Sequence, residues 1–341
     1  MENNESTEYL NYLRVFAAFA VLMLHVICTP IVFCQDLYSS VELFLVRFSR
    51  NLLNWCVPVF VMITGVLFLN PEKELPLGKL FKKYISRFVI VILTFGTLYS
   101  LMELIFEDRS LSVSKILLAL KNALVGKSWD HMWYVYMAIG LYLLLPLMKV
   151  AVKNISDKIL YYSLGVLFIT ASILPYVSNF INFANHFSMV SIYIFYLLLG
   201  YAIHFKNFRL KNIYSVVILL LYAVYVGLIQ FNPFFIIENN AALKTLGYES
   251  PVVVLAAFAI FSLCKNISRE SKVIKFMAPL TFGIYIMHPV FINFCYKVLH
   301  LTVEKYSLGI SLLIVSLITI IGSIVATFIL RLIPFVRKYI L

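Results

Sequence analysis

The chain has 341 residues, of which 62% are hydrophobic and 13% are charged, and its mean hydropathy is +0.93. A water-soluble protein of this length cannot bury so much apolar surface, so the composition excludes a soluble multidomain enzyme and indicates an integral membrane protein. With 12 Gly and 11 Pro, a collagen-like or low-complexity chain is excluded as well. The net charge of +12 reflects basic residues placed around membrane segments, and we expect no nucleic-acid partner.

Neither the cysteines nor the N-terminus points to a secreted protein. The five cysteines show no CxxC spacing, and most lie in apolar segments, so we expect no zinc site, no other metal site and no disulfide framework. The first residues lack the basic start and the small-residue cleavage site of a secretory signal, so we expect the first apolar segment to remain as a membrane anchor. The cysteines are Cys28, Cys34, Cys56, Cys264 and Cys295.

Ten apolar segments have roughly the length at which an α-helix crosses the hydrocarbon layer, about 17 to 25 residues. The second segment is longer than needed and is expected to tilt, and the eighth is short. Together they predict an all-α, polytopic bundle of about ten transmembrane helices that forms one domain over residues 1–341. The segments are 10–33, 43–69, 87–106, 132–149, 159–175, 188–204, 213–231, 251–264, 276–296 and 308–332.

Basic residues predict the orientation, because Lys and Arg resist translocation. If the N-terminus is cytoplasmic, the inner connections carry 18 Lys and Arg and the outer ones carry seven. We therefore predict that both termini are cytoplasmic. The longest outer connection contains residues 112–124, whose apolar and polar positions segregate with helical spacing, which predicts an interfacial helix.

The first predicted span contains two ionisable residues, Arg14 and His25. Such residues are costly inside a membrane, and each requires a partner or a function. Eleven positions place the two side chains on one helix face, about 16.5 Å apart along the axis. A neutral imidazole near the midplane is a natural proton acceptor. A structural interpretation stays open, in which Arg14 extends to the interface and His25 is hydrogen-bonded inside the bundle.

A second polar group is predicted near the outer ends of several spans. It forms either an acceptor-binding cluster or a set of structural ion pairs, such as an arginine with Glu42 or Glu103. Nearby, Trp129, Trp133 and Tyr134 serve either as an interfacial aromatic belt or as a platform on which sugar rings stack. The candidate substrate-binding residues are Arg47, Arg50, Glu103, Asp130, His131, Trp133 and His288.

On the inner side, Lys82, Lys83 and Arg87 lie at the foot of the third span, where they would hold phosphate groups. The same residues are also what a positive-inside distribution produces without any ligand. The remaining histidines, His186, His204 and His300, are expected to be solvated and receive no role.

Five short motifs, spread in order from residue 11 to residue 289, resemble those of the membrane acyltransferase-3 family. The first is an Arg and a His separated by ten residues, and the others are a Pro-containing, Phe-rich helix, a basic loop, a His-x-Trp-Tyr start and a Gly-Ile-Tyr-x-x-His-Pro sequence. In this chain they are residues 11–25, 58–65, 82–87, 131–137 and 280–289.

The resemblance implies about ten helices in the bacterial cytoplasmic membrane and an acyl-CoA donor that enters from the cytoplasm. The donor would be acetyl-CoA, with succinyl-CoA as the alternative, and the acyl group would pass to a hydroxyl of an envelope carbohydrate. The implied partners are thus a carbohydrate acceptor and membrane lipid. The layout is similar to that of members without a fused extracellular hydrolase-like domain.

Carried over by position, Arg14 and His25 match the essential pair of the family, and Lys82, Lys83 and Arg87 match its donor-side basic loop. Three positions depart from the pattern. Asn11 stands where an Asp is common, Thr64 replaces a Ser, and Lys82-Lys83 replaces an Arg pair, so phosphate would meet point charges there rather than bidentate forks.

The resemblance gives His25 one of two roles: general base on the acceptor hydroxyl, or acceptor of the acyl group before passing it on. Arg47, Arg50 or His288 would then stabilise the oxyanion, and Asp130, His131 and Trp133 would bind the sugar. Two alternatives are a flippase or transporter of a lipid-linked saccharide and a sensor or anchor with a degenerate site. Inverted repeats and paired broken helices, which are typical of transporters, are not found in the sequence.

Overall fold

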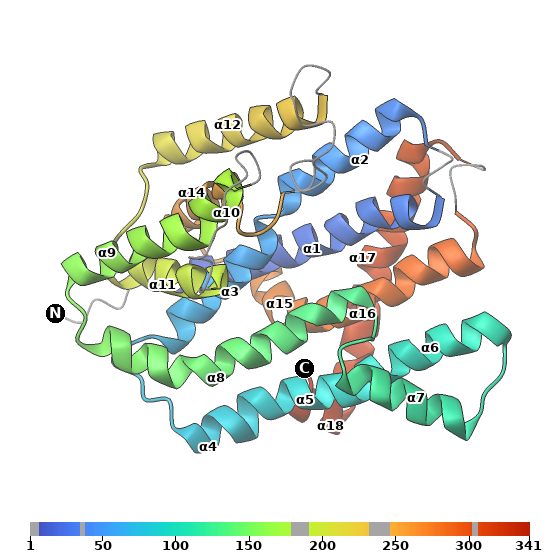
Figure 1. Ribbon diagram of the computed structural model, residues 1–341. Coiled ribbons are helices and arrows are strands. Elements are labelled where there is room, and N and C mark those ends of the chain that lie inside the picture. The colour runs from blue at the N-terminus through green and yellow to red at the C-terminus, as the bar shows by residue number, and fades with distance from the viewer. Residues whose placement is uncertain (1–6, 35–37, 179–190, 232–245, 302–305) are drawn as a thin grey trace. The chain divides into compact units, whose positions relative to one another are not determined.

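The computed structural model describes residues 7–34, 38–178, 191–231, 246–301 and 306–341. All regular elements in these ranges are helices (Figure 1). Eight helical segments are long and apolar enough to cross a membrane. The predicted all-α, polytopic membrane fold is therefore confirmed, whereas the cytoplasmic location of the termini stays a prediction.

The chain divides into two compact units. The single domain expected over residues 1–341 stays a prediction. The first unit is Met1–Asn70 with Ile155–Val325, and the second is Pro71–Asn154 with Ala326–Leu341. Helices α1 (Glu8–Cys34), α2 (Ser40–Leu53), α3 (Cys56–Phe68), α9 (Asp157–Phe168), α10 (Leu174–Val177), α11 (Ile192–Phe205), α12 (Asn212–Phe231), α14 (Pro251–Cys264), α15 (Lys272–Met277) and α16 (Thr281–Asn293) belong to the first unit.

The second unit holds α4 (Leu77–Lys79), α5 (Ser86–Val91), α6 (Thr97–Asp108), α7 (Val113–Leu124), α8 (Trp133–Lys153) and α18 (Pro334–Tyr339). Helix α17 (Leu308–Leu332) begins in the first unit and ends in the second. Short π-helical turns interrupt several of these runs. They are η2 (Leu80–Ile85), η3 (Ile92–Gly96), η5 (Ile169–Ile173) and η7 (Phe294–Val298).

The ten predicted spans correspond to these helices, but two of them are short. Helices α11 and α14 have 14 residues each, or about 21 Å of helix, less than the roughly 30 Å of a hydrocarbon layer. Residues 188–190, where the sixth span was predicted to begin, lie outside the described residues. The structure therefore supports eight full-length spans and two shorter apolar helices.

The second predicted span is a broken helix rather than one long, tilted helix. Helices α2 and α3 meet at Asn54 and Trp55. Pro58 explains the break, because it has no backbone N–H to donate to the carbonyl of Asn54. The buried side chain of Asn54 instead donates from Nδ2 to the carbonyl of Leu246, 2.6 Å away. The break thus provides a polar contact that holds the segment before α14.

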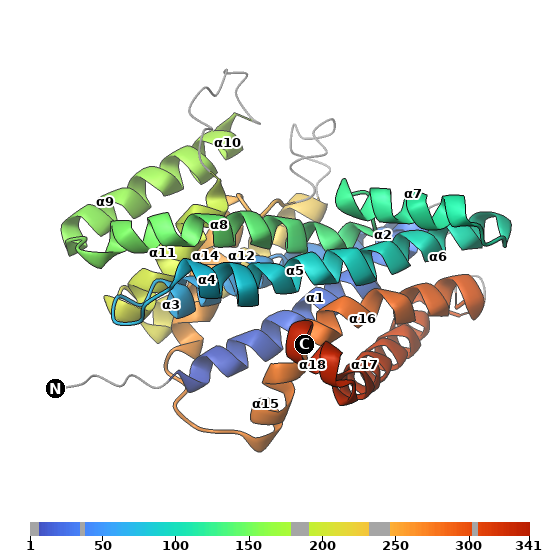
Figure 2. The same cartoon turned by 90° about the horizontal axis from the view of Figure 1, so that it is seen from below.

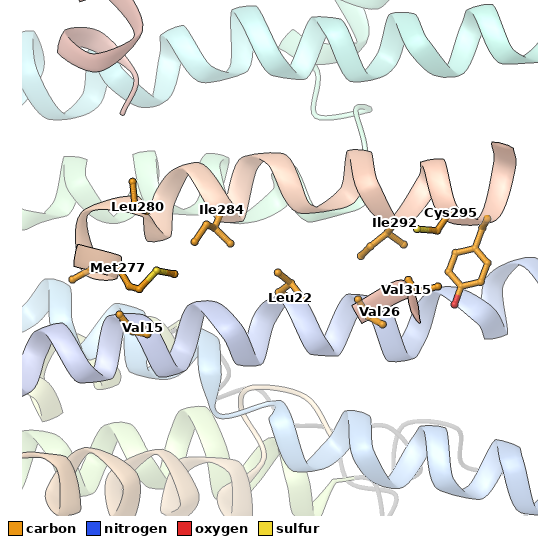
Figure 3. Packing of buried hydrophobic residues seen from close by; sticks show 11 residues of the cluster. Val15, Leu22, Val26, Met277, Leu280, Ile284, Ile292, Cys295 and Val315 are labelled. Atoms are coloured by element: carbon orange, nitrogen blue, oxygen red, sulfur yellow. The ribbon is translucent and has the colours of Figure 1, made fainter. Parts of the chain in front are cut away.

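Helix α1 packs along α16 through a row of aliphatic side chains. Figure 3 shows Val15, Leu22 and Val26 of α1 directed towards Ile284 and Ile292 of α16. In lipid, such helices associate through van der Waals packing, because hydrocarbon is as apolar as the side chains themselves. This row therefore fixes the rotation of α1 about its own axis relative to α16.

Helices α3 and α11 approach until their backbones touch. A Cβ atom on Gly65 would lie 2.1 Å from the carbonyl oxygen of Leu197, and one on Gly200 would lie 2.1 Å from that of Met62. Small residues at a helix crossing are the usual means of close approach in membranes. Helix α3 also packs on α1. The close crossing of α3 and α11 therefore holds in place a helix that contacts α1.

In the second unit, α7 lies beside α6 (Figures 1 and 2). The helix predicted over 112–124 is thereby confirmed as α7, with Ser112 as its N-cap. Buried Ala119 and Ala123 form its packed face, whereas Val113 is 73% exposed and Leu117 is 62% exposed. Its location at the membrane interface stays a prediction.

We predict that Gly65→Ala destabilises the protein by about 1–3 kcal/mol or more, because the facing carbonyl belongs to a packed backbone and cannot turn away. Gly165→Ala in α9 is the control, since a Cβ there has nothing within 4 Å and alanine favours the helix. Thermal unfolding of the purified protein in detergent measures both. Equal melting temperatures for the two variants would contradict the backbone contact.

Candidate active site

Arg14 and His25 lie on the face of α1 that is turned to the interior of the first unit. Both side chains are half-buried. Phe16, on the opposite side of the helix, is 44% exposed. Four residues within about 60° of Arg14 on the helix are each 5% exposed or less: Leu10, Ala17, Ala18 and Val21. Asn11 and Cys28, on the same side, are half-buried like Arg14 and His25.

His25 is paired with His288 of α16. The two ring centroids are 4.9 Å apart, and the planes are inclined by 57°. His288 is fully buried, and its ring is also 6.1 Å from that of Tyr285. The sequence placed His25 and His288 in spans one and nine, and the packing of α1 on α16 brings them together.

The hydrogen bonds of the two rings define their neutral tautomers. Nδ1 of His25 is 2.8 Å from the carbonyl oxygen of Val21, and Nδ1 of His288 is 3.2 Å from that of Ile284. A carbonyl oxygen only accepts, so each Nδ1 carries the proton. In both neutral rings, Nε2 is therefore the nitrogen with the free lone pair, and it is the atom that can accept a proton.

Arg14 lies within a short polar chain at the start of α1. Its Nη1 donates to Oδ1 of Asn11 over 3.4 Å, and Nδ2 of Asn11 is 3.4 Å from Oε2 of Glu8. Asn11 therefore bridges the guanidinium to a carboxylate through its amide. Asn11 stands where an Asp is common in the sequences that this chain resembles. In this chain the carboxylate is that of Glu8, one helical turn before Asn11.

The arginines of α2 are half-buried and belong to the first unit. Arg50 lies close enough to Cys28 and Tyr248 for its charge to act on both groups. The predicted pairing of an arginine with Glu42 is wrong, because Glu42 is the N3 residue of a capping box with Ser39. The charge of Arg50 thus acts on α1 at Cys28, about one turn beyond His25.

The basic segment predicted to hold phosphate lies in the second unit. Lys82 and Lys83 are exposed on the π-helical turn η2, a kind of turn that is frequent at functional sites. Arg87 is half-buried, and its Nε donates to the carbonyl oxygen of Ile340, 2.7 Å away. One of the three cations therefore also holds the C-terminal segment.

The predicted outer polar residues are divided between the two units. Arg47, Arg50 and His288 belong to the first unit, and Glu103, Asp130, His131 and Trp133 belong to the second. Within the second unit, Asp130 and Trp133 are exposed, whereas His131 is 3% exposed.

The aromatic group predicted beside His131 includes Tyr99, which the sequence did not predict. Trp129 stacks on the fully buried Tyr99 with ring centroids 4.5 Å apart and planes inclined by 2°, and Tyr99 lies 5.4 Å from His131. Nε1 of Trp129 donates to Oε2 of Glu103 over 3.1 Å. One face of Trp129 is therefore covered by protein, whereas Trp133 is exposed.

The expectation that His204 is solvated is wrong. His204 is 9% exposed, and its Nδ1 lies 2.8 Å from the hydroxyl of Tyr9, which is itself 1% exposed. Nζ of Lys265 donates to the carbonyl oxygens of Ile203 and His204. These contacts join the ends of α11 and α14 to the start of α1. Tyr9, which makes the contact on α1, lies five residues before Arg14.

The fold and the site define a polytopic membrane protein whose first helix carries an arginine and a histidine on its interior face, the histidine paired with one from α16. The family model described as an acyltransferase domain, of acyltransferase family 3, matches residues 7–332. This range is nearly the whole chain, so the protein belongs to the membrane acyltransferase-3 family and is a membrane acyltransferase. No curated protein and no solved structure gives a match.

We predict that Trp129→Phe destabilises the protein by about 1–3 kcal/mol, because it removes the donor to Glu103 and part of the stacked ring. Trp133→Phe is the matched control, since Trp133 is 37% exposed, and its effect should stay within about 0.5 kcal/mol. Unfolding in detergent followed by intrinsic fluorescence compares them. If Trp133→Phe lowered the stability more than Trp129→Phe, Trp133 rather than Trp129 would be the structural residue.

Proposed function

We propose that this membrane acyltransferase moves an acyl group from cytoplasmic acyl-CoA to a hydroxyl of an envelope polysaccharide in the bacterial cytoplasmic membrane. Acetyl is the group we assign, and succinyl is the alternative. The observation that supports the proposal best is the pair of His25, on the interior face of α1, and His288 of α16, with both Nε2 atoms basic. A family match over residues 7–332 supplies the reaction class.

His25 acts as the general base. Its Nε2 takes the proton of the acceptor hydroxyl while the hydroxyl oxygen attacks the carbonyl carbon of the thioester. The tetrahedral intermediate then collapses, the carbon–sulfur bond breaks, and the CoA thiolate leaves and is protonated. The products are an O-acyl ester and free CoA, and His25 returns to its neutral form.

His288 serves this step better as a proton acceptor than as an oxyanion donor. A neutral His288 whose Nδ1–H is bound to Ile284 has only a lone pair at Nε2. As an oxyanion donor it would have to be charged, 4.9 Å from a ring that becomes charged in the same step. That repulsion is about 3 kcal/mol at an effective dielectric constant of about 20. His288 therefore shares the proton that His25 takes.

The oxyanion is assigned to the arginines of α2. A guanidinium is charged at every relevant pH and offers several N–H donors to a developing negative charge. Arg50 is the better candidate because its charge reaches Cys28, three residues after His25 on α1. Arg47, one turn earlier on α2, is the second candidate.

The remaining residues bind the two substrates. Lys82, Lys83 and Arg87 hold the phosphates of the donor, and Arg14 lies beside its pantetheine arm. For the acceptor, Asp130 and Trp133 offer an exposed carboxylate and an exposed ring, the pair of groups with which proteins commonly bind sugars. Glu103 and His131 support this surface from beneath, through Trp129 and Tyr99.

We predict that His25→Gln lowers acyl transfer by about 10²–10⁴-fold, the usual contribution of a positioned general base. Proteoliposomes loaded with labelled acetyl-CoA and envelope polysaccharide measure the transfer. His300→Asn is the control, because His300 is exposed and asparagine tolerates its positive φ of 49°. If His25→Gln folds normally and transfers at the wild-type rate, the assignment of the base is wrong.

We also predict that His288→Asn lowers kcat by about 10–100-fold without raising KM for acyl-CoA, since the second ring acts on the proton and not on the donor. The solvent deuterium isotope effect on kcat should change in the same variant. A rise in KM with kcat unchanged would instead make His288 a substrate-binding residue.

A covalent acyl-His25 intermediate and a flippase function make different predictions. Rapid acid quench followed by mass spectrometry of the protein would reveal an acylated histidine, whereas direct transfer leaves none. A flippase has no use for acetyl-CoA, so binding of acetyl-CoA by the purified protein favours the enzyme. Mass spectrometry of envelope glycans from cells with and without the gene then identifies the lost acyl group.

A further inference from the structure

The C-terminal helix lies against the basic segment of the second unit. Helix α18 contacts α5, and Nε of Arg87 donates to the carbonyl oxygen of Ile340, directly after α18. Figure 1 shows α18 next to α5. The segment of Lys82, Lys83 and Arg87 therefore has a neighbour that is far away in the sequence.

This neighbour adds positive charge. Arg337 and Lys338 of α18 are exposed, as are Lys82 and Lys83 of η2. None of these four residues forms an ion pair with an acidic side chain in the described part of the chain. Arg331, at the end of α17, lies close enough to Arg87 for the two like charges to repel.

The four exposed cations of η2 and α18 repel one another, and a bound anion relieves that repulsion. Arg87 donates to a backbone acceptor of the C-terminal segment through Nε, and its guanidinium has five N–H donors in all. The arrangement is that of an anion site built from two segments, with Arg87 between them.

We infer that Arg337 and Lys338 form the second half of the phosphate site, together with Lys82 and Lys83. The inference rests on the proposed function, and the ligand is the nucleotide end of acyl-CoA. That end carries a diphosphate and a separate 3′-phosphate, more negative charge than two lysines and one arginine neutralise. The two cations of α18 neutralise the remaining negative charge. Arg337 also offers the bidentate phosphate binding that Lys82 and Lys83 lack.

A second source of phosphate has to be separated from the first. The segment around α18 also exposes Leu332, Phe335 and Tyr339, side chains that suit a bilayer surface, where anionic lipid headgroups offer the same phosphate chemistry. CoA and lipid differ in that CoA is soluble and its 3′-phosphate can be removed. The experiment therefore varies the lipid and the nucleotide independently.

The test uses the full chain in nanodiscs of phosphatidylcholine, with CoA and 3′-dephospho-CoA titrated by calorimetry. The double variants are K82Q/K83Q and R337Q/K338Q, and the control is K211Q/K272Q, which removes two exposed, unpaired charges from the first unit. We expect both test variants to raise Kd for CoA by about tenfold and the control to leave it unchanged. Melting temperatures verify that all variants fold.

The outcomes separate the two claims. If K82Q/K83Q raises Kd for CoA and R337Q/K338Q does not, the C-terminal contribution is overturned and the donor site stands. If the wild-type protein does not bind CoA at all, the proposed function fails together with the inference. If R337Q/K338Q leaves CoA binding intact but abolishes an effect of added phosphatidylglycerol on stability, the cations bind lipid and the inference is overturned. An equal loss of affinity in both variants supports it.

Discussion

Placing a guanidinium and an imidazole in the first membrane helix constrains the rest of the structure. Neither group is stable against hydrocarbon, so the face that carries Arg14 and His25 must turn inward and meet polar partners. Asn11 and Glu8 provide these near Arg14, and His288 provides one for His25. The same desolvation that makes the two groups costly also makes them useful, because a base and a charge act most strongly where water is excluded.

The helices around α1 hold this face in place by the aliphatic row on α16 and by close packing behind α3. Gly65 and Gly200 let α3 and α11 touch, and α3 packs on α1. At its start, α1 is tied to α11 through the Tyr9–His204 hydrogen bond. A ring on a packed, interior helix keeps its direction more firmly than one on a loop, which agrees with the proposed role of His25 as the general base.

Much of the fold follows from hydropathy alone. Lipid requires every backbone group of a span to be bonded within its own helix, so an apolar segment of sufficient length has one available structure. That is why the helix at 112–124 and the described parts of the ten segments were predicted correctly as helical. The break at Asn54 was not predicted, although Pro58 is visible in the sequence. A proline in a membrane helix either kinks the helix or breaks it. Here the contact of Asn54 with Leu246, which is distant in the sequence, accompanies a break.

By itself, the sequence determined the membrane class, the helical segments and the face of α1 that carries Arg14 and His25, because these depend on length, composition and the 100° step of one helix. Only the tertiary structure decided that His288 meets His25, that His204 is buried against Tyr9, that Trp129 engages Glu103 and that Arg87 holds the C-terminal segment. Each of these contacts joins helices distant in the chain. Such a contact depends on the rotation and depth at which two helices pack, and no local pattern encodes either.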